Sequence, residues 1–435
     1  MTRLRLAVVS DLHIGRARSW DLCPYFSDEC RARGSGFKCK IPFETETPRC
    51  QDEKYVDAFR DFVRDQELTA DYLIVLGDLT HRGQPDEFQY ATEVLQDIRA
   101  ALAVAKSDVI LVPGNHDVDW QVSALPDKTG VRFEQRFFPL AHKKWSLAKL
   151  MKRGAPKGWS CFGAPYFSLW SDEELLVVIY NSSWDDRKEK KVHHGHIDAV
   201  HLGELRAWLR RSAAPAKTKI LAVHHHPVQY PNPFRDKEDF SEMDGATPQL
   251  LELMHENRFD LILHGHKHRP YFLPINSHAG QQIPILCAGS FSAIPDDRIL
   301  FDAPNVFHII ELDEKAIPTD VAHPVLERGR VLTWAFDPAR GWVRMHATEG
   351  IGGTEPFGTY VARDVLFGEI RAWVETELAN TGRARSTELF QARPHLGYVE
   401  RRVMSHVLDE LKEAASLELS IPDDDPTGFV LTRRV

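Results

Sequence analysis

The chain has 435 residues, a formal net charge of −9, and 43% hydrophobic and 27% charged residues. This length and apolar fraction allow a sizeable core in one large domain with an appendage, or in two domains. The acidic balance argues against a general affinity for nucleic acid or acidic lipid. Six cysteines are too few for a secreted disulfide scaffold.

A short apolar run over residues 4–9 is predicted to form a buried strand. The run is too short for a signal-peptide core or a membrane span, and no other run approaches spanning length. We therefore expect a cytoplasmic protein without a membrane segment. Asp11 and His13 follow the strand directly, in the position where ligands bind in open α/β sheets.

Residues 15–50 are predicted to form a long insertion, rich in Arg, Gly, Pro and Cys and without a clear period. The insertion holds Cys23, Cys30, Cys39 and Cys50. Their spacing lacks the Cys-x-x-Cys pattern of common zinc sites. A structural metal, disulfides, another thiolate cluster and unpaired thiols remain open. A reducing cytoplasm favours the metal or the unpaired thiols over disulfides.

Helices and strands alternate in the next part of the chain. The apolar pattern predicts helices over 52–65 and 85–102 and strands over 72–76 and 109–112. Asp78 follows the first of these strands after a glycine, and the second runs into Gly114-Asn115-His116-Asp117. The alternation predicts a mostly parallel sheet, so we expect these polar side chains to meet at one edge of it.

The same alternation continues to about residue 312. Elements are expected at residues 131–150, 175–180, 199–209, 219–223, 248–257, 261–263, 283–287 and 306–312. Two of the expected strands end in histidine-rich runs. His224-His225-His226-Pro227 follows the strand over 219–223, and His264-Gly265-His266-Lys267-His268 follows the strand over 261–263.

The character of the chain changes after residue 312. Residues 328–346 are predicted to form a hairpin, and two amphipathic helices are expected over 361–378 and 398–415. We therefore divide the chain into a domain over 1–312 and an α+β appendage over 313–435. The amphipathic helices are interpreted as packing faces. Capping of the site, formation of an oligomer and docking of a partner remain open roles for the appendage.

Seven oxygen and nitrogen donors follow apolar strands: Asp11, His13, Asp78, Asn115, His225, His266 and His268. Two divalent ions about 3.5–4 Å apart need roughly this number of protein ligands and a bridging water. Asp78, central in the series, is the candidate for the carboxylate that bridges the ions. Mixed imidazole, carboxylate and amide donors fit Mn, Fe, Zn, Co or Ni better than Mg or Ca.

His116 is not assigned as a metal ligand, and we predict that it is catalytic. An imidazole there donates a proton to the leaving oxygen or holds a phosphoryl oxygen. Asp117 is predicted to fix the tautomer of His116, as carboxylates commonly do for working histidines.

These motifs, taken together from residue 4 to about 312, resemble the calcineurin-like metallophosphoesterase family. The family pattern is Asp-x-His, Gly-Asp, Gly-Asn-His-Asp/Glu, a His after a strand, and Gly-His-x-His. The resemblance implies an α/β fold of four layers, with two central sheets flanked by helices. The cysteine-bearing insertion and the appendage lie outside the resemblance.

The resemblance also implies a division of the ligands between two divalent or mixed-valence metal ions. The first ion is expected on Asp11, His13, Asp78 and His268, and the second on Asp78, Asn115, His225 and His266. The family histidine usually stands two residues before a proline, which selects His225. His224 is the second choice for this ligand and His226 the third.

The stretch from Gly77 to Gly83 looks like that of cyclic-nucleotide-phosphodiesterase-like members, which usually carry Asp where His81 stands. We expect a phosphodiesterase that hydrolyses a small nucleotide or related diester by attack of a metal-bridging hydroxide. A DNA or RNA nuclease and a phosphomonoesterase are the alternatives, and the acidic balance disfavours nucleic acid. A scaffold with a vestigial site is disfavoured because no ligand is missing.

Overall fold

The computed structural model describes residues 2–14, 51–118 (except 82 and 84), 166–186 (except 185), 193–211, 218–229, 243–276, 282–292, 303–313, 328–348, 350–421 and 428–433. The cysteine-bearing insertion and the predicted helix over 131–150 lie outside these residues. The chain forms two units, each described by itself. The main unit comprises Leu6–His308 and Trp334–Val343, and the C-terminal unit comprises Met1–Arg5, Ile309–Thr333 and Arg344–Val435.

The first sheet contains the strands that lead to the earliest polar motifs. Its strands are β1 (Thr2–Val9), β2 (Tyr72–Val75), β3 (Val109–Leu111), β12 (Val306–Asp313), β13 (Gly329–Asp337), β14 (Gly341–Arg344) and β15 (Thr354–Phe357). The order is β14-β13-β12-β1-β2-β3, with β15 paired to β13. β1, β2 and β3 are parallel, so their carboxyl ends lie at one edge.

The second sheet leads to the histidine-rich runs. Its strands are β4 (Phe167–Ser171), β5 (Leu175–Tyr180), β7 (Thr218–Val223), β9 (Leu261–His264), β10 (Pro270–Asn276) and β11 (Gln282–Ala288), in the order β10-β11-β9-β7-β5-β4. The four central strands are parallel and the two edge strands are antiparallel. The central strands read as continuous apolar runs because both of their faces are buried.

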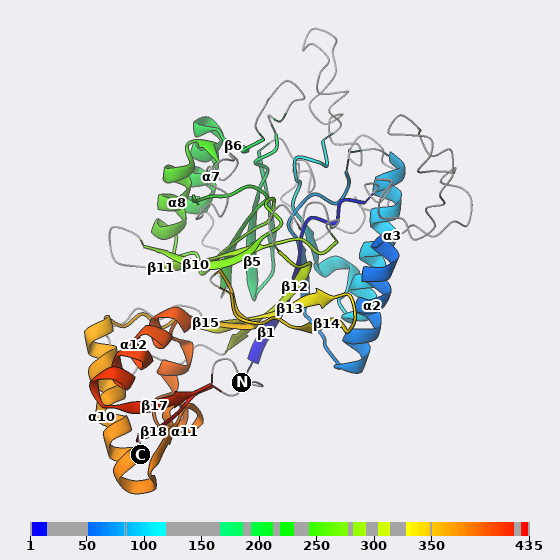
Figure 1. Ribbon diagram of the computed structural model, residues 1–435. Coiled ribbons are helices and arrows are strands. Elements are labelled where there is room, and N and C mark those ends of the chain that lie inside the picture. Colours follow the sequence, from blue (N-terminus) through cyan, green and yellow to red (C-terminus); the bar gives the residue numbers. More distant parts are fainter. Residues whose placement is uncertain are drawn as a thin grey trace, which may run out of the picture. The chain divides into compact units, whose positions relative to one another are not determined.

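Helices flank the two sheets of the main unit. They are α2 (Gln51–Asp65), α3 (Pro85–Ala101), α7 (Ala199–Arg211) and α8 (Thr247–Glu256), with the short η2 (Lys106–Asp108) before β3. α2 and α3 lie on one side of the unit, and α7 and α8 on the other (Figure 1). A two-stranded sheet joins β6 (His196–Ile197) to β8 (Asp244–Gly245). The predicted α/β fold of two sheets between helices is confirmed.

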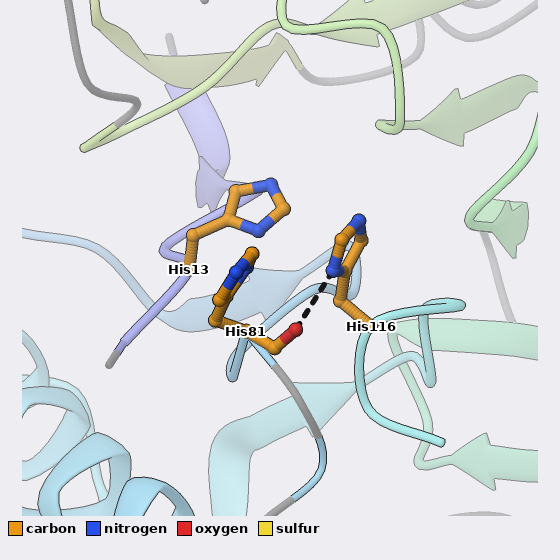
Figure 2. Close-up of side chains that lie close together, drawn as sticks. All are labelled: His13, His81 and His116. Atoms are coloured by element: carbon orange, nitrogen blue, oxygen red, sulfur yellow. Dashed lines mark hydrogen bonds between the residues drawn. The ribbon is translucent and has the colours of Figure 1, made fainter. Parts of the chain in front are cut away.

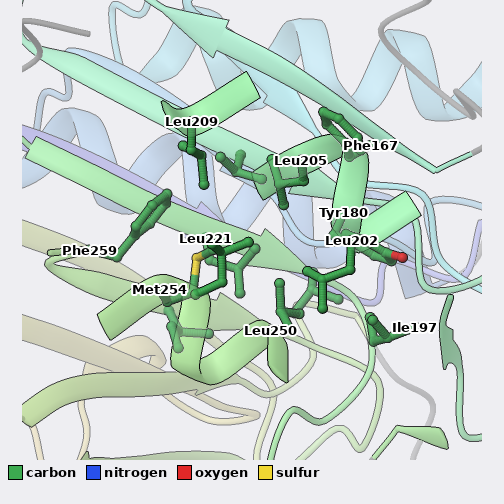
Figure 3. Close-up of a cluster of buried hydrophobic side chains, with 14 of the residues drawn as sticks. Phe167, Tyr180, Ile197, Leu202, Leu205, Leu209, Leu221, Leu250, Met254 and Phe259 are labelled. Atoms are coloured by element: carbon green, nitrogen blue, oxygen red, sulfur yellow. The ribbon is translucent and has the colours of Figure 1, made fainter. Parts of the chain in front are cut away.

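A buried apolar cluster joins α7 and α8 to the second sheet (Figure 3). Leu202, Leu205 and Leu209 recur at helical spacing on the buried face of α7. Leu221, from the central strand β7, is fully buried in the same cluster. This spacing gives α7 an apolar stripe that faces the core, and packing of that stripe stabilises the helix more than its intrinsic propensity does.

The C-terminal unit contains elements that the apolar pattern did not predict. Its helical part consists of α10 (Arg363–Thr381), β16 (Arg383–Arg385), α11 (Ser386–Ala392), η5 (Pro394–Tyr398), α12 (Arg401–Ala414), β17 (Leu417–Ser420) and β18 (Val430–Arg433). The strands form a sheet in the order β16-β18-β17. Helices α11 and α12 follow each other across the short η5, and β17 and β18 form an antiparallel pair that joins β16.

Substitution Leu221→Ala is expected to lower the free energy of unfolding by about 2–5 kcal/mol, because it removes methylene groups from a closed cluster and leaves a cavity. Chemical denaturation followed by circular dichroism measures this loss. Val200→Ala, on a side chain of α7 that is 70% exposed, is the matched control and is expected to cost no more than about 0.5 kcal/mol. Equal losses for the two variants would contradict the assignment of the core.

Candidate metal centre

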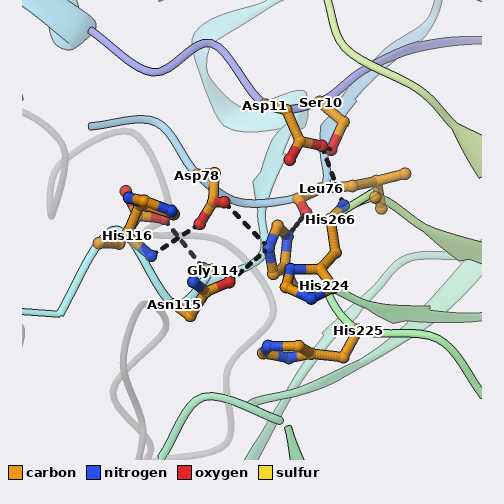
Figure 4. Close-up of polar contacts among 12 residues, drawn as sticks. Ser10, Asp11, Leu76, Asp78, Gly114, Asn115, His116, His224, His225 and His266 are labelled. Atoms are coloured by element: carbon orange, nitrogen blue, oxygen red, sulfur yellow. Dashed lines mark hydrogen bonds and ion pairs between the residues drawn. The ribbon is translucent and has the colours of Figure 1, made fainter. Parts of the chain in front are cut away.

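The predicted donors lie together in the main unit, where five strands end. β1, β2, β3, β7 and β9 lead into loops that carry these polar side chains. The residues brought together are Asp11, His13, Asp78, Asn115, His224, His225, His266 and His268. Figure 4 labels six of them, all except His13 and His268. Asp11 and His225 are fully buried, and Asp78 is 1% exposed. The site is therefore a largely buried polar cluster in which His266 is partly exposed.

Several of these residues adopt a backbone conformation that L-amino acids rarely take. The angle φ is positive at Asp11, His13, Asp78, His266 and His268, with values between 48° and 81°. Such residues cost of order 1–3 kcal/mol each and persist only where the surrounding structure holds them. Their concentration in these loops indicates that the fold maintains strain in order to aim the side chains at one point.

One group of donors surrounds the end of β1. The Nε2 atoms of His13 and His268 are 2.8 Å apart, and Nε2 of His268 is 3.3 Å from Oδ1 of Asp11. Nε2 of His13 is 3.7 Å from Oδ2 of Asp78. Ligands bound at about 2.0–2.2 Å to one ion lie roughly 3–3.5 Å from each other. These separations fit a shared metal ion.

A second group lies on the other side of Asp78. Nε2 of His224 is 3.2 Å from Oδ2 of Asp78 and 3.2 Å from Oδ1 of Asn115. Ring nitrogens of His224, His225 and His266 lie within 4.8 Å of one another. Asp78 thus faces both groups, which is the position that a bridging ligand requires. Asp11, which belongs to the first group, also has a carboxylate oxygen within 4.8 Å of a ring nitrogen of His224.

Imidazole side chains surround the buried Asp78 carboxylate and stabilise its charge in place of water. Burial by itself raises the pKa of the Asp78 carboxyl, but His224 and His116 outweigh burial and hold it well below its usual range. In turn, burial lowers the pKa of His224, and Asp78 reverses this and raises it to about 9. A metal ion displaces the proton that an ionised carboxylate draws onto such an imidazole.

The geometry differs from the sequence preference for His225 over His224. His224 donates from Nδ1 to the carbonyl oxygen of Leu76 at 2.7 Å, which leaves Nε2 free to face Asp78 and Asn115. This is the usual arrangement of a metal-binding histidine. Nδ1 of His225 lies 2.7 Å from Oγ of Ser182. Counting back from Pro227 missed this because neighbouring side chains point in different directions.

The surroundings of His116 also differ from the prediction. Nδ1 of His116 donates to the carbonyl oxygen of His81 at 2.9 Å, and the two rings stack with centroids 5.3 Å apart (Figure 2). The ring of His13 meets His116 edge-on at 4.7 Å. The tautomer of His116 is therefore held by a backbone carbonyl. A sequence pattern contains no signal for such a contact.

Asp117 does not orient His116, so this part of the prediction is wrong. Its carboxylate accepts hydrogen bonds from the backbone N–H of Thr80 at 3.0 Å, from the Thr80 hydroxyl at 3.2 Å and from the N–H of Gly114 at 2.9 Å. Burial and the charge of Asp78 raise the pKa of Asp117 to about 7. Asp117 instead ties the loop after β3 to the loop after β2.

The sequence analysis did not identify the residues that fix the Asp11 loop. Ser10 donates to Oδ2 of Asp11 at 2.5 Å, and the N–H of His266 donates to the same oxygen at 3.1 Å. The hydroxyls of Ser290 and Ser292 donate to the carbonyl oxygens of Asp11 and Leu12. Serines are too common at strand ends to signal this role.

Buried polar atoms without hydrogen-bond partners also indicate that these residues fit a metal centre, independently of the sequence motifs. Oδ1 of Asp11 and Nε2 of His225 and of His266 are buried and have no hydrogen-bond partner. An unsatisfied buried polar atom costs about 1–3 kcal/mol. Burial lowers the pKa of His13, His225 and His266 well below its ordinary value, so these imidazoles are neutral and able to bind a cation.

Comparisons with known proteins identify a family for the chain. A family model described as calcineurin-like phosphoesterase matches residues 4–270. A comparison with curated proteins gives no match. Within the described residues no helix has the length and apolar character that crossing a membrane requires.

Solved structures similar to the chain include a dimetal phosphatase from Danio rerio, at 14% identity and a TM-score of 0.38, covering 81% of this chain and 99% of that one. The purple acid phosphatase PPD1 of yellow lupin matches at 12% identity and a TM-score of 0.43, covering 78% of this chain and 52% of that one. Vacuolar Protein Sorting 29 from Cryptosporidium parvum matches at 10% identity and a TM-score of 0.32, covering 82% and 100%.

Substitution His224→Gln is expected to reduce bound metal from about two equivalents to about one, because the second group of donors loses the imidazole nearest Asp78. Elemental analysis of protein loaded with Mn²⁺ or Zn²⁺ measures this. His226→Gln, at the neighbouring position, is the control and is expected to keep the full metal content. If His225→Gln lost metal and His224→Gln did not, His225 would be the ligand instead of His224.

Proposed function

The chain belongs to the calcineurin-like phosphoesterase family and is a metal-dependent phosphoester hydrolase. On that premise, we propose that it is a phosphodiesterase with a dinuclear centre that acts on a small nucleotide or a related diester. The observation that carries the proposal is the position of Asp78. This buried carboxylate faces two groups of metal-binding side chains, and His116 lies beside it.

We assign one ion to Asp11, His13, Asp78 and His268, and the other to Asp78, Asn115, His266 and a histidine of the run 224–226, with His224 preferred to His225. Imidazole, carboxylate and amide donors favour Mn, Fe, Zn, Co or Ni. Bound there, such ions supply an activated water and neutralise charge on the phosphoryl group.

His116 is the proposed general acid. Its backbone N–H donates to Oδ1 of Asp78 at 2.8 Å, which anchors the residue to the bridging carboxylate. Its Nδ1–H donates to the carbonyl of His81, so Nε2 is the atom that delivers a proton. The leaving alkoxide of a nucleotide diester is a poor leaving group, and proton transfer to it typically contributes about 10²–10⁴-fold in rate.

Substrate class is tested with protein loaded with Mn²⁺ and offered bis-p-nitrophenyl phosphate, p-nitrophenyl phosphate, cyclic nucleotides, and single- and double-stranded DNA. We expect diesters and cyclic nucleotides to turn over faster than the monoester. Asp78→Asn is expected to lower every rate by orders of magnitude, because the shared ligand is lost, whereas Val200→Ala leaves the rates unchanged. Monoester turnover far above diester turnover would refute the diester assignment. A steeply salt-dependent DNA affinity would support a nuclease instead.

The role of His116 is tested by varying the leaving group. His116→Ala is expected to slow diesters with alkoxide leaving groups by about 10²-fold or more, because these groups need a proton. Bis-p-nitrophenyl phosphate, whose p-nitrophenolate leaves without a proton, is expected to lose much less activity. Comparing kcat for the two substrates measures the difference. Equal losses of kcat for the two substrates would indicate that His116 binds the phosphoryl group and does not donate a proton.

A further inference from the structure

The C-terminal unit contains a pocket of about 360 Å³ that is formed by its own residues alone. This volume lies at the small end of the range for small-molecule sites. Strands β13 and β15 supply part of its lining, including Leu332 and Pro356. Helix α12 supplies Arg401, Met404 and Leu408, which recur at helical spacing along one face.

The start of α12 is held by partners inside the same unit. Nε of Arg401 lies 2.8 Å from Oε1 of Glu355, and Nη2 of Arg402 donates to the carbonyl oxygen of Gly350 at 2.9 Å. In DNA-binding helix-turn-helix proteins, the first residues of the second helix of the motif contact bases. Here these arginines have internal partners, and the exposed side of α12 carries Asp409 and Glu410. The geometry therefore favours a small ligand over DNA.

One of the arginines that line the pocket forms no ion pair with a carboxylate of the described residues. Glu311 is paired with Arg5 at 3.0 Å, and Arg401 is paired with Glu355. Arg330 also lines the pocket, and its guanidinium lies 5.2 Å from the centre of the Tyr398 ring. No carboxylate of the described residues forms an ion pair with it. A guanidinium in this setting favours a planar anion, which it binds with two parallel hydrogen bonds.

The apolar part of the lining reaches the surface. Ile421 is 53% exposed and is one of three exposed large hydrophobic side chains in the described part of the chain. It lines the same pocket as the buried Met404 and Leu408. A ligand with an apolar body gains free energy by covering this surface.

We propose that this pocket binds a small amphipathic carboxylate, with the anionic group paired to Arg330 and the apolar chain along Leu332, Met404 and Ile421. This site is separate from the metal centre, since its lining residues all belong to the C-terminal unit and the metal-binding residues all belong to the main unit. It gives the C-terminal unit a ligand-sensing role that does not depend on the substrate of the hydrolase.

Octanoate is the probe, and 1-octanol is the neutral molecule of the same chain length. Titration calorimetry on the full-length protein is expected to show saturable binding of octanoate, at least about fivefold tighter than binding of 1-octanol. The titration is repeated with Asp78→Asn, and octanoate binding is expected to be unchanged. Loss of binding in this variant would show that octanoate binds at the metal centre instead. Absence of saturable binding, or equal affinity for the two probes, would overturn the proposal.

Arg330→Gln removes the charge and is expected to weaken octanoate binding about tenfold without changing 1-octanol binding. Arg328→Gln is the matched control, because Arg328 contacts the same Tyr398 ring at 5.7 Å but does not line the pocket. Leu332→Phe, which fills the pocket, is expected to weaken both probes. Circular dichroism confirms that each variant is folded. Equal effects of Arg330→Gln and Arg328→Gln would refute the assignment of the carboxylate to this pocket.

Discussion

The structure of the main unit depends on the burial of one carboxylate. Asp78 is almost inaccessible to water, and an isolated buried charge is strongly unfavourable. The protein compensates with imidazoles on two sides and with a backbone N–H from His116. These partners come from loops after β1, β3 and β7, so the charge is stable only when both sheets are assembled. The same arrangement places Asp78 between two sets of donors.

A second constraint is the strain in the loops that carry the donors. Positive φ angles at Asp11, Asp78 and His266 turn the chain back toward the centre. The parallel strands before them are buried on both faces and give each loop a rigid starting point. Side chains that take no part in the proposed chemistry hold the loops in place, such as Asp117 between Thr80 and Gly114. Precise placement of a catalytic group requires support of this kind.

The C-terminal unit holds the start of α12 with its own residues. The arginines at the start of this helix bind Glu355 and Gly350 within the same unit. Tyr398, in the turn before α12, donates to Asp313 at 2.6 Å and stacks with Arg330. These contacts join the segment before α12 to β12 and β13 within the same unit.

The sequence alone predicted the central strands of both sheets of the main unit, because long apolar runs are local patterns that burial enforces, but it left out the edge strands β4 and β10. It also predicted Asp11, His13, Asp78, Asn115, His266 and His268 as one set, since parallel strands end at a common edge. Short strands such as β16 and β17 escaped prediction because a few residues carry too weak a period. The domain boundaries drawn at residue 312 remain a prediction.

Only the tertiary structure decided the roles that depend on direction. Three consecutive histidines have the same chemistry in the sequence. The structure brings Nε2 of His224 to 3.2 Å from both Asp78 and Asn115, whereas Nε2 of His225 has no hydrogen-bond partner. The carbonyl of His81, and not Asp117, orients His116. That Arg330 has no ion-pair partner among the described residues emerges only when the partners of Arg401 and Glu311 are known. In each case the deciding contact joins residues that are distant in the chain or uses a backbone atom, and neither leaves a pattern in the sequence.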